Sequence, residues 1–365
     1  MKDIIQDTRK TQEKFLKKAI STIAKFDMLG KKERVLVGVS GGPDSVALLN
    51  LLLMIKQKCS LEHVGIAHLN HMLRDKEADR DENFVKKIAK NLNIPCFIEK
   101  KNVAAFAKKH RLSIEDGARR VRYRFLKEIF KSNQYSKIAL GHNKDDNAEL
   151  ILMNILRGSG TKGLSGIPPK REGIIIRPLI EISKKEIYEF LKSINKTYVM
   201  DSTNNKNIYL RNSIRNNLIP LIEENYNPKI KESLIRLSNI IKDEDEWMEK
   251  ETDISFTKVL ESVSPDDVNP DTIQLSLKLF LNCHLALQKR IMRKAIKIIN
   301  RDLKKITLNH IEDAIKLLIS KSSGESIDLP DQIRIYKHNK SFFVKKESFP
   351  LRELGEKRKN TRKTC

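Results

Sequence analysis

The sequence predicts an α/β protein: a Rossmann-like parallel sheet with helices on both faces, followed by a mainly helical C-terminal region. Two observations lead to this fold class. Over the first two hundred residues, short apolar segments typical of buried strands alternate with segments of helical periodicity. Polar or glycine-rich segments follow the apolar ones, as at the strand ends of a parallel sheet. The expected strands are residues 34–40, 63–70, 94–100 and 137–142, and the expected helices between them are 46–55, 79–93 and 113–130.

The rest of the chain changes from mixed to helical patterning near residue 221. Its segments, in order, are a Gly-, Pro- and Ser-rich loop at 157–173, an apolar segment at 174–180, a helix at 183–195, a polar segment at 201–220, a helical stretch at 229–251, a break at 262–271, helices at 288–301 and 307–320, hairpin-like alternation at 324–346 and a basic tail, expected to be disordered, at 356–365. We therefore expect domains at residues 1–220 and 221–325, with a small hairpin and the tail at 326–365.

The formal net charge is +24, and most of it lies in the first part of the chain. Residues 1–220 hold 43 Lys and Arg against 24 Asp and Glu, whereas residues 221–365 hold 28 against 23. Such a field attracts and holds a polyanion, which favours a nucleic acid as partner. A general bias towards lysine, isoleucine and asparagine would give a similar composition, so the charge favours this partner without establishing it.

Targeting signals and cysteine motifs are not evident. No apolar run is long enough to span a membrane, and the first twenty residues mix acids and bases, unlike a signal peptide. The four cysteines (Cys59, Cys96, Cys283 and Cys365) are far apart and form no CxxC pair, zinc spacing or disulfide framework. We expect a cytoplasmic protein. Its oligomeric state stays open, a homodimer included.

The segment Ser40–Ser45, "SGGPDS", joins the first expected strand to a leucine-rich helix. Gly41 and Gly42 permit positive φ and a close backbone approach, and Pro43 suits a first helical turn. Backbone N–H groups at such a joint form an anion site, most often for phosphate. The pattern is neither a Walker A loop nor GxGxxG. Asp44 would repel phosphate unless it holds a cation such as Mg²⁺. The alternative is an ordinary strand-to-helix turn.

Two further polar segments, 68–74 and 141–146, follow expected strands and could share one crevice with Ser40–Ser45. In the second, His142 and Asp146 are four apart and Asp146 and Glu149 three apart, so one helical face would carry an imidazole and two carboxylates. Such a face suits an ammonium ligand and proton transfer. Alternatively, these acids serve only the dipole of a helix N-terminus. Spacing does not decide whether Asp145 or Asp146 points inward.

Arginines recur at helical spacing in two segments, where each could bind phosphate or form a solvated face. The pairs are Arg119 and Arg122, Arg120 and Arg124, and Arg211 and Arg215. The last pair lies beside asparagines, which suits contacts to phosphate and to a cytosine edge.

The segment Ser40–Ser45 resembles the pyrophosphate-binding loop of the ATP-pyrophosphatase (PP-loop) superfamily. Together with residues 67–74, 113–126, 141–167 and 201–220, it makes the chain similar to the tRNA(Ile)-lysidine synthase family, strongly over the first two-thirds and weakly beyond. The resemblance implies that ATP adenylates the C2 oxygen of the wobble cytidine in a CAU anticodon. The ε-amine of free lysine then displaces AMP, and the tRNA changes from methionine to isoleucine specificity.

The resemblance also implies roles for individual residues. The implied ATP-binding residues are Ser40, Gly41, Gly42, Pro43, Asp44, Ser45, Ala67, His68 and Gly141, with Asp44 holding Mg²⁺; the implied catalytic residues are Asp44, His142 and Asp146; Asp146 and Glu149 would bind lysine, and Arg119, Arg122, Arg211 and Arg215 would bind tRNA or phosphate. Residues 1–220 would form the catalytic domain and residues 221–325 a tRNA-binding domain.

One departure from the family pattern bears on these implications. Longer family members carry an additional C-terminal domain for tRNA recognition, which we expect to be absent here, so residues 221–320 would carry more of that task.

Among rival functions, a tRNA thiolase would need paired cysteines or an iron–sulfur cluster, and a glutamine-fed synthetase would need a nucleophilic cysteine near the start. A non-catalytic RNA-binding protein would have no chemical reason to retain Asp44, His142, Asp146 and Glu149 together.

Overall fold

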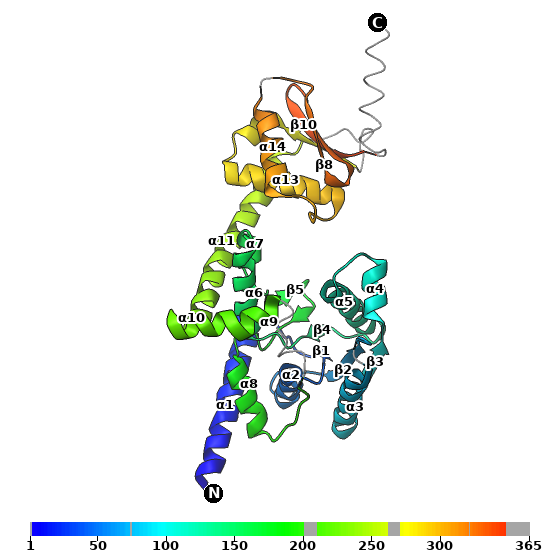
Figure 1. The fold of residues 1–365 in the computed structure, drawn as a ribbon, viewed down its shortest axis with the longest axis vertical. Helices are drawn as coiled ribbons and strands as arrows, with labels where there is room; N and C mark the ends of the chain where they lie inside the picture. The colour runs from blue at the N-terminus through cyan, green and yellow to red at the C-terminus, as the bar shows by residue number, and fades with distance from the viewer. Residues whose placement is uncertain (1, 74, 201–209, 262–270, 321, 348–365) are drawn as a thin grey trace. The chain divides into compact units, whose positions relative to one another are not determined.

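The computed structural model describes residues 2–73, 75–200, 210–261, 271–320 and 322–347 (Figure 1). It forms two compact units, residues 1–242 and 243–365. The expected basic tail and most of the expected break at 262–271 lie outside the described residues, as do residues 201–209 of the polar segment. None of the helices in the described part of the chain combines the length and apolar character that crossing a membrane requires.

The first unit is built on the expected parallel sheet. Its strands are β1 (Arg34–Gly38), β2 (His63–Asn70), β3 (Cys96–Lys100), β4 (Lys137–Ala139), β5 (Lys170–Arg171) and β6 (Ile175–Ile176). They lie in the order β3-β2-β1-β4-β6-β5, and β5 alone of these six is antiparallel to its neighbour. The chain order reverses between β1 and β4, and a ligand crevice is expected beyond the carboxyl ends of strands at such a point.

Helices cover both faces of this sheet, as expected (Figure 1). They are α1 (Lys2–Lys25), α2 (Pro43–Met54), α3 (Asp75–Leu92) and α8 (Lys184–Ser193) on one face, and α4 (Val103–Lys109) and α5 (Ile114–Ser132) on the other. Alternate residues of β1 serve the two cores: Val35 and Val37 pack in the first, and Leu36 packs in the second. Burial on both sides is why β1 reads as a continuous apolar run.

Helix α1 was not expected, because its sequence is dominated by charged residues. Phe15, Ala19 and Ile23 are spaced by four residues and are buried against the sheet. The ring of Phe15 stacks on Phe190 of α8 with a centroid distance of 3.9 Å. A narrow apolar stripe thus anchors a helix whose remaining faces are polar.

The chain continues through α6 (Lys144–Leu156), α7 (Thr161–Leu164), α9 (Leu210–Ser213), α10 (Ile219–Asn225) and α11 (Ile230–Val259). The second unit combines helices with an antiparallel sheet in the order β7-β10-β9-β8. Its elements are β7 (Thr272–Ser276), α12 (Leu277–Leu281), α13 (Leu285–Asn300), α14 (Leu308–Ile319), β8 (Ser326–Leu329), β9 (Ile333–Lys337) and β10 (Ser341–Lys346). The expected hairpin therefore belongs to a larger sheet, since β7 comes from the region expected to be helical. The domain boundaries at residues 220 and 325 stay predictions.

Candidate active site

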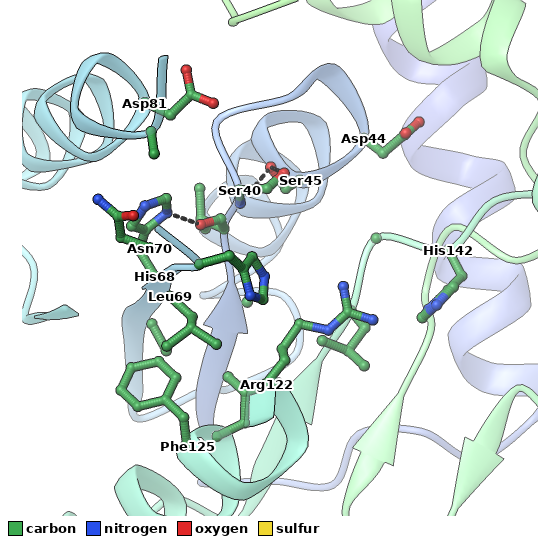
Figure 2. Close-up of a pocket in the computed structure, with 18 of the residues that line it drawn as sticks. Ser40, Asp44, Ser45, His68, Leu69, Asn70, Asp81, Arg122, Phe125 and His142 are labelled. Atoms are coloured by element: carbon green, nitrogen blue, oxygen red, sulfur yellow. Dashed lines mark hydrogen bonds between the residues drawn. The ribbon is translucent and has the colours of Figure 1, made fainter. Parts of the chain in front are cut away.

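The loop between β1 and α2 is held in shape by its own serines (Figure 2). The Ser45 hydroxyl donates to the Gly42 carbonyl at 2.9 Å and accepts from the Ser40 backbone N–H at 3.1 Å. Gly41 has a φ of 94°, which favours glycine. Helix α2 begins at Pro43, and no side chain caps its first turn. The backbone N–H groups at this helix end are therefore suited to bind an anion.

A pocket of about 440 Å³ lies where β1, β2 and β4 end. It is lined by Ser40, Asp44 and Ser45 of the loop, Ala67 and His68 of β2, Gly141, His142 and Asp146 after β4, and Arg122 and Arg211, among others. The three polar segments thus share one crevice, as expected. Gly141 lets the two segments approach closely, because a Cβ at this position would lie only 3.1 Å from the backbone carbonyl carbon and oxygen of Asp44.

Asp44 carries an unusual carboxyl group. Burial, together with the nearby charge of Asp146, raises its pKa from 3.8 to about 6, although a hydrogen bond of 2.8 Å from the Asn143 amide opposes the shift. Two mutually repelling carboxylates beside an anion-binding loop suit a divalent cation. No group of three or more His, Cys, Asp or Glu within the described ranges could hold a metal. The carboxylates of Asp44 and Asp146 are the type of ligand that Mg²⁺ uses, since it binds through one or two carboxylates plus phosphate oxygens and water.

The prediction that His142, Asp146 and Glu149 share one helical face is only partly correct. Helix α6 begins at Lys144, so His142 precedes the helix and lies in the segment after β4. Asn143 is the N-cap: its side chain accepts from the Asp146 N–H at 2.8 Å, while Asp146 accepts from the Asn143 N–H at 3.2 Å. Asp146 therefore stabilises the N-terminus of the helix and also lines the pocket.

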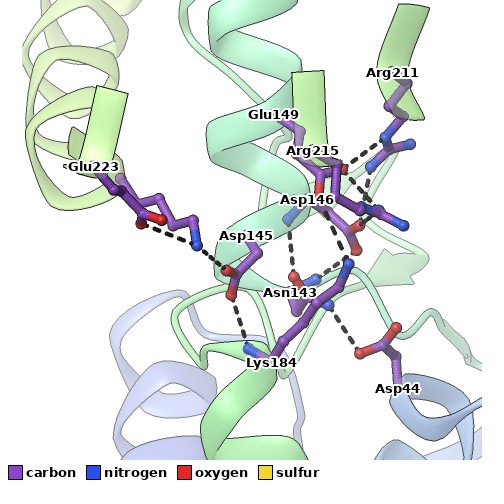
Figure 3. Close-up of polar contacts among 10 residues, drawn as sticks. Asp44, Asn143, Asp145, Asp146, Glu149, Lys184, Arg211, Arg215 and Glu223 are labelled. Carbon is purple, nitrogen blue, oxygen red and sulfur yellow. Dashed lines mark hydrogen bonds and ion pairs between the residues drawn. The ribbon is translucent and has the colours of Figure 1, made fainter. Parts of the chain in front are cut away.

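The structure distinguishes the two adjacent aspartates (Figure 3). Asp146 lines the pocket with Asp44. Asp145 turns away: it accepts a hydrogen bond of 2.8 Å from the Lys184 backbone N–H and pairs with Lys231 at 3.1 Å. Asp146 is therefore the aspartate placed to meet a ligand.

Glu149 is 2% exposed and is paired with two arginines (Figure 3). Arg215 donates to it at 2.6 and 2.8 Å, and Arg211 at 3.0 Å. Both arginines also donate to Asp146, at 3.0 and 3.3 Å. Burial alone would raise the pKa of Glu149, but the hydrogen bond from Arg215 and the charges of Lys184, Arg215 and Arg211 outweigh it and hold the pKa below its usual range.

These contacts differ from the binding roles that were expected for the four residues. Arg211 and Arg215 were expected to meet tRNA, and Asp146 and Glu149 to meet lysine, whereas here the four groups pair with one another. Glu149 and Arg215 also line a second cavity, of about 510 Å³, together with Tyr188 of α8. Asp146 therefore lines the first cavity and Glu149 the second, and both carboxylates are paired with Arg211 and Arg215.

Arg177 is a site residue that the sequence reasoning missed. It follows β6, is 2% exposed, and donates from Nε to His142 Nδ1 at 3.1 Å. Its other nitrogens donate to the Pro168 carbonyl at 2.6 Å and to the Tyr123 hydroxyl at 3.3 Å. An available signal was an arginine inside the apolar segment "IIIRPLI", because a buried arginine needs dedicated partners.

The structure divides Arg119 and Arg122 of α5, which the spacing had placed on one stripe. Arg122 lines the pocket, and its buried Nε has no hydrogen-bond partner among the described residues. Arg119 is exposed and lies over the Tyr123 ring at 5.3 Å. Arg120 and Arg124 are exposed, the latter over Phe106. Of the four, Arg122 is therefore the one placed to contact a phosphate in the pocket.

Comparison with known proteins places the chain in a family. The PP-loop domain family matches residues 9–222. A tRNA(Ile)-lysidine synthase of Clostridioides difficile is 35% identical over 337 residues, covering 92% of this chain and 72% of its own. Those of Caldanaerobacter subterraneus and Clostridium tetani are each 36% identical, covering 91% and 86% of this chain and 69% and 66% of their own. The chain therefore belongs to the tRNA(Ile)-lysidine synthase family of PP-loop proteins.

Proposed function

We propose that this protein uses ATP to join free lysine to the wobble cytidine of a tRNA(Ile) with a CAU anticodon. The observation that carries the proposal is the single pocket in which the Ser40–Ser45 loop, Asp44 and Asp146 meet, with Glu149 directly behind. The loop supplies an anion site for the phosphates, and the carboxylates of Asp146 and Glu149 supply the charge that an amine substrate needs.

In the first step, the C2 oxygen of cytidine attacks the α-phosphorus of ATP, and pyrophosphate leaves with the bonding electron pair. The serine hydroxyls and backbone N–H groups of the loop would hold the β- and γ-phosphates. Asp44 would hold Mg²⁺, which supplies charge neutralisation at the phosphates. The adenosine would lie against Ala67 and His68, which line the same pocket.

In the second step, the ε-ammonium of lysine gives a proton to a carboxylate of the pocket, the free amine attacks C2, the C2–O bond breaks and AMP leaves with the bonding electron pair. Asp146 and Glu149 would bind the ammonium groups of the lysine. Because Arg211 and Arg215 occupy these carboxylates here, lysine binding requires the arginines to move or share them. Phosphates of the tRNA are natural new partners for the displaced guanidinium groups.

Lysine incorporation tests this function. With ATP, Mg²⁺ and lysine, a tRNA(Ile) transcript bearing CAU is expected to gain the mass of one lysyl group on a single cytidine, whereas methionine tRNA is not. A gain of sulfur in the presence of a sulfur donor would instead favour the tRNA thiolase alternative. That alternative is not favoured by the relatives, which are lysidine synthases.

Arg122→Met is expected to raise the KM for ATP about tenfold to 100-fold, because it removes a partly buried charge-assisted contact to phosphate. Arg120→Met is the matched control: it removes an exposed arginine two positions away on the same helix. Initial-rate measurements over a range of ATP concentrations would check this. Equal effects of the two substitutions would contradict a phosphate contact by Arg122.

Binding of tRNA is expected to weaken steeply with salt, because the net charge of +24 favours phosphate contacts. With about four such contacts, the affinity should fall about 100-fold between roughly 50 and 200 mM salt. Fluorescence anisotropy with labelled tRNA would measure the slope. A flat profile would contradict the electrostatic account.

A further inference from the structure

His142 and Arg177 share one hydrogen bond whose direction is fixed by chemistry. The guanidinium group of arginine has five N–H donors and no acceptor, and it does not lose its proton in proteins. The contact from Arg177 Nε to His142 Nδ1, at 3.1 Å, is therefore donated by the arginine. Nδ1 must present its lone pair, so a neutral imidazole here carries its proton on Nε2.

The position of Arg177 is determined by more than this one bond. Its side chain is 2% exposed, and its other nitrogens donate to the Pro168 carbonyl and to the Tyr123 hydroxyl. Arg177 therefore cannot turn away without leaving buried donors and acceptors unpaired, which is costly. Because Arg177 donates to Nδ1, its fixed position also fixes the orientation of the His142 ring.

The surroundings of His142 oppose a second proton. Burial lowers the pKa of His142 well below its usual value, and the positive charges of Arg177, Arg122, Arg211 and Arg119 lower it further. Four carboxylates, those of Asp44, Glu77, Asp81 and Asp146, line the same pocket, and their charge acts in the opposite direction. The imidazolium form is thus disfavoured by the same arginine that fixes the tautomer.

We propose that Arg177 is a positioning residue, which holds His142 as a neutral imidazole that donates from Nε2 to an oxygen of the reacting phosphate. This inference rests on the proposed function. It makes His142 a hydrogen-bond donor and removes it as the base that accepts a proton from lysine, since both ring nitrogens are already committed.

The tautomer can be read directly by ¹⁵N NMR of the full-length protein labelled at histidine, with His142→Gln identifying the signal. The expected result is an Nε2–H imidazole that is still neutral at the pH where free histidine is half protonated, about 6.5. An Nδ1–H tautomer, or protonation at or above that pH, would overturn the proposal. Because no turnover is measured, this result stands apart from whether the protein makes lysidine.

Variants at Arg177 test the cause. In Arg177→Met, His142 is expected to lose its fixed Nε2–H tautomer, and kcat should fall about tenfold or more, while the KM for ATP changes much less. Arg177→Lys, which keeps the charge and one donor, should restore part of kcat. Tyr123→Phe is the matched control, since it removes another partner of Arg177 and should leave the tautomer unchanged. Should Arg177→Met fail to fold, the wild-type spectrum decides; an unchanged tautomer in a folded Arg177→Met would refute the role.

Discussion

Asp44→Asn is expected to abolish ATP cleavage while making the first unit more stable. The catalytic loss follows from the proposed role of Asp44 as the Mg²⁺ ligand beside the phosphates. The gain in stability follows from its environment. Burial and the charge of Asp146 raise the pKa of Asp44 to about 6, so the ionised carboxylate destabilises the folded state. Asparagine keeps the shape and can still accept the hydrogen bond from Asn143.

The sign of the pH dependence is determined by the two pKa values. Between pH 3.8 and about 6 the unfolded chain ionises Asp44 while the folded chain keeps it protonated, so the folded state loses relative stability as the pH rises. Above pH 6 the cost is constant, at about 2 to 3 kcal/mol. The variant should therefore melt about 5 °C higher at pH 7 and no higher near pH 4.

Thermal unfolding of the metal-free protein at both pH values, with an assay of pyrophosphate release, would measure the two effects together. Glu232→Gln is a suitable control, because Glu232 pairs with Lys144 at 2.6 Å and is half exposed. An Asp44→Asn protein with full activity would remove Asp44 from the mechanism. A lower melting temperature at pH 7 would contradict the account of its buried charge.

Glu149→Gln is expected to raise the KM for lysine about 100-fold while changing the KM for ATP no more than a few-fold. The charged hydrogen bond to an ammonium group that it removes is worth about 1.5 to 3 kcal/mol. The same change leaves Arg215 and Arg211 short of a partner at a residue that is 2% exposed, so stability should also fall by about 3 kcal/mol.

Initial rates with lysine and ATP varied separately would distinguish a lysine subsite from a general loss of folded protein. Glu232→Gln again provides the control, since it neutralises a carboxylate whose partner begins the same helix α6. Equal losses in the use of ATP and lysine would count against the lysine subsite.

Much of the first unit could be predicted from the sequence because its signals are local. The β1–loop–α2 joint combines a doubly buried strand, a glycine at positive φ and a proline at the start of a helix, and β2 was predicted at residues 63–70 as observed. Helix α1 and strand β7 were missed. The apolar stripe of the first lies among many charged residues, and the second is stabilised by pairing with β10, more than sixty residues away.

The site was predicted less fully because its contacts are long-range. Spacing suggested that His142 shares a helical face with Asp146, but Asn143 is the N-cap and α6 begins at Lys144, two residues after His142. The pairing of Glu149 with Arg211 and Arg215 joins residues more than sixty positions apart, which no local pattern reveals. The only sequence signal for Arg177 was that a charged residue lies within an apolar segment.

The products of ATP cleavage test the central claim most directly. With Mg²⁺ and the CAU-bearing tRNA(Ile), ATP labelled at the α-phosphorus should yield AMP and pyrophosphate, with the labelled AMP attached to tRNA when lysine is withheld. Formation of ADP and phosphate, or no tRNA-dependent cleavage at all, would contradict the proposal that the Ser40–Ser45 loop and Asp44 serve adenylation of a base.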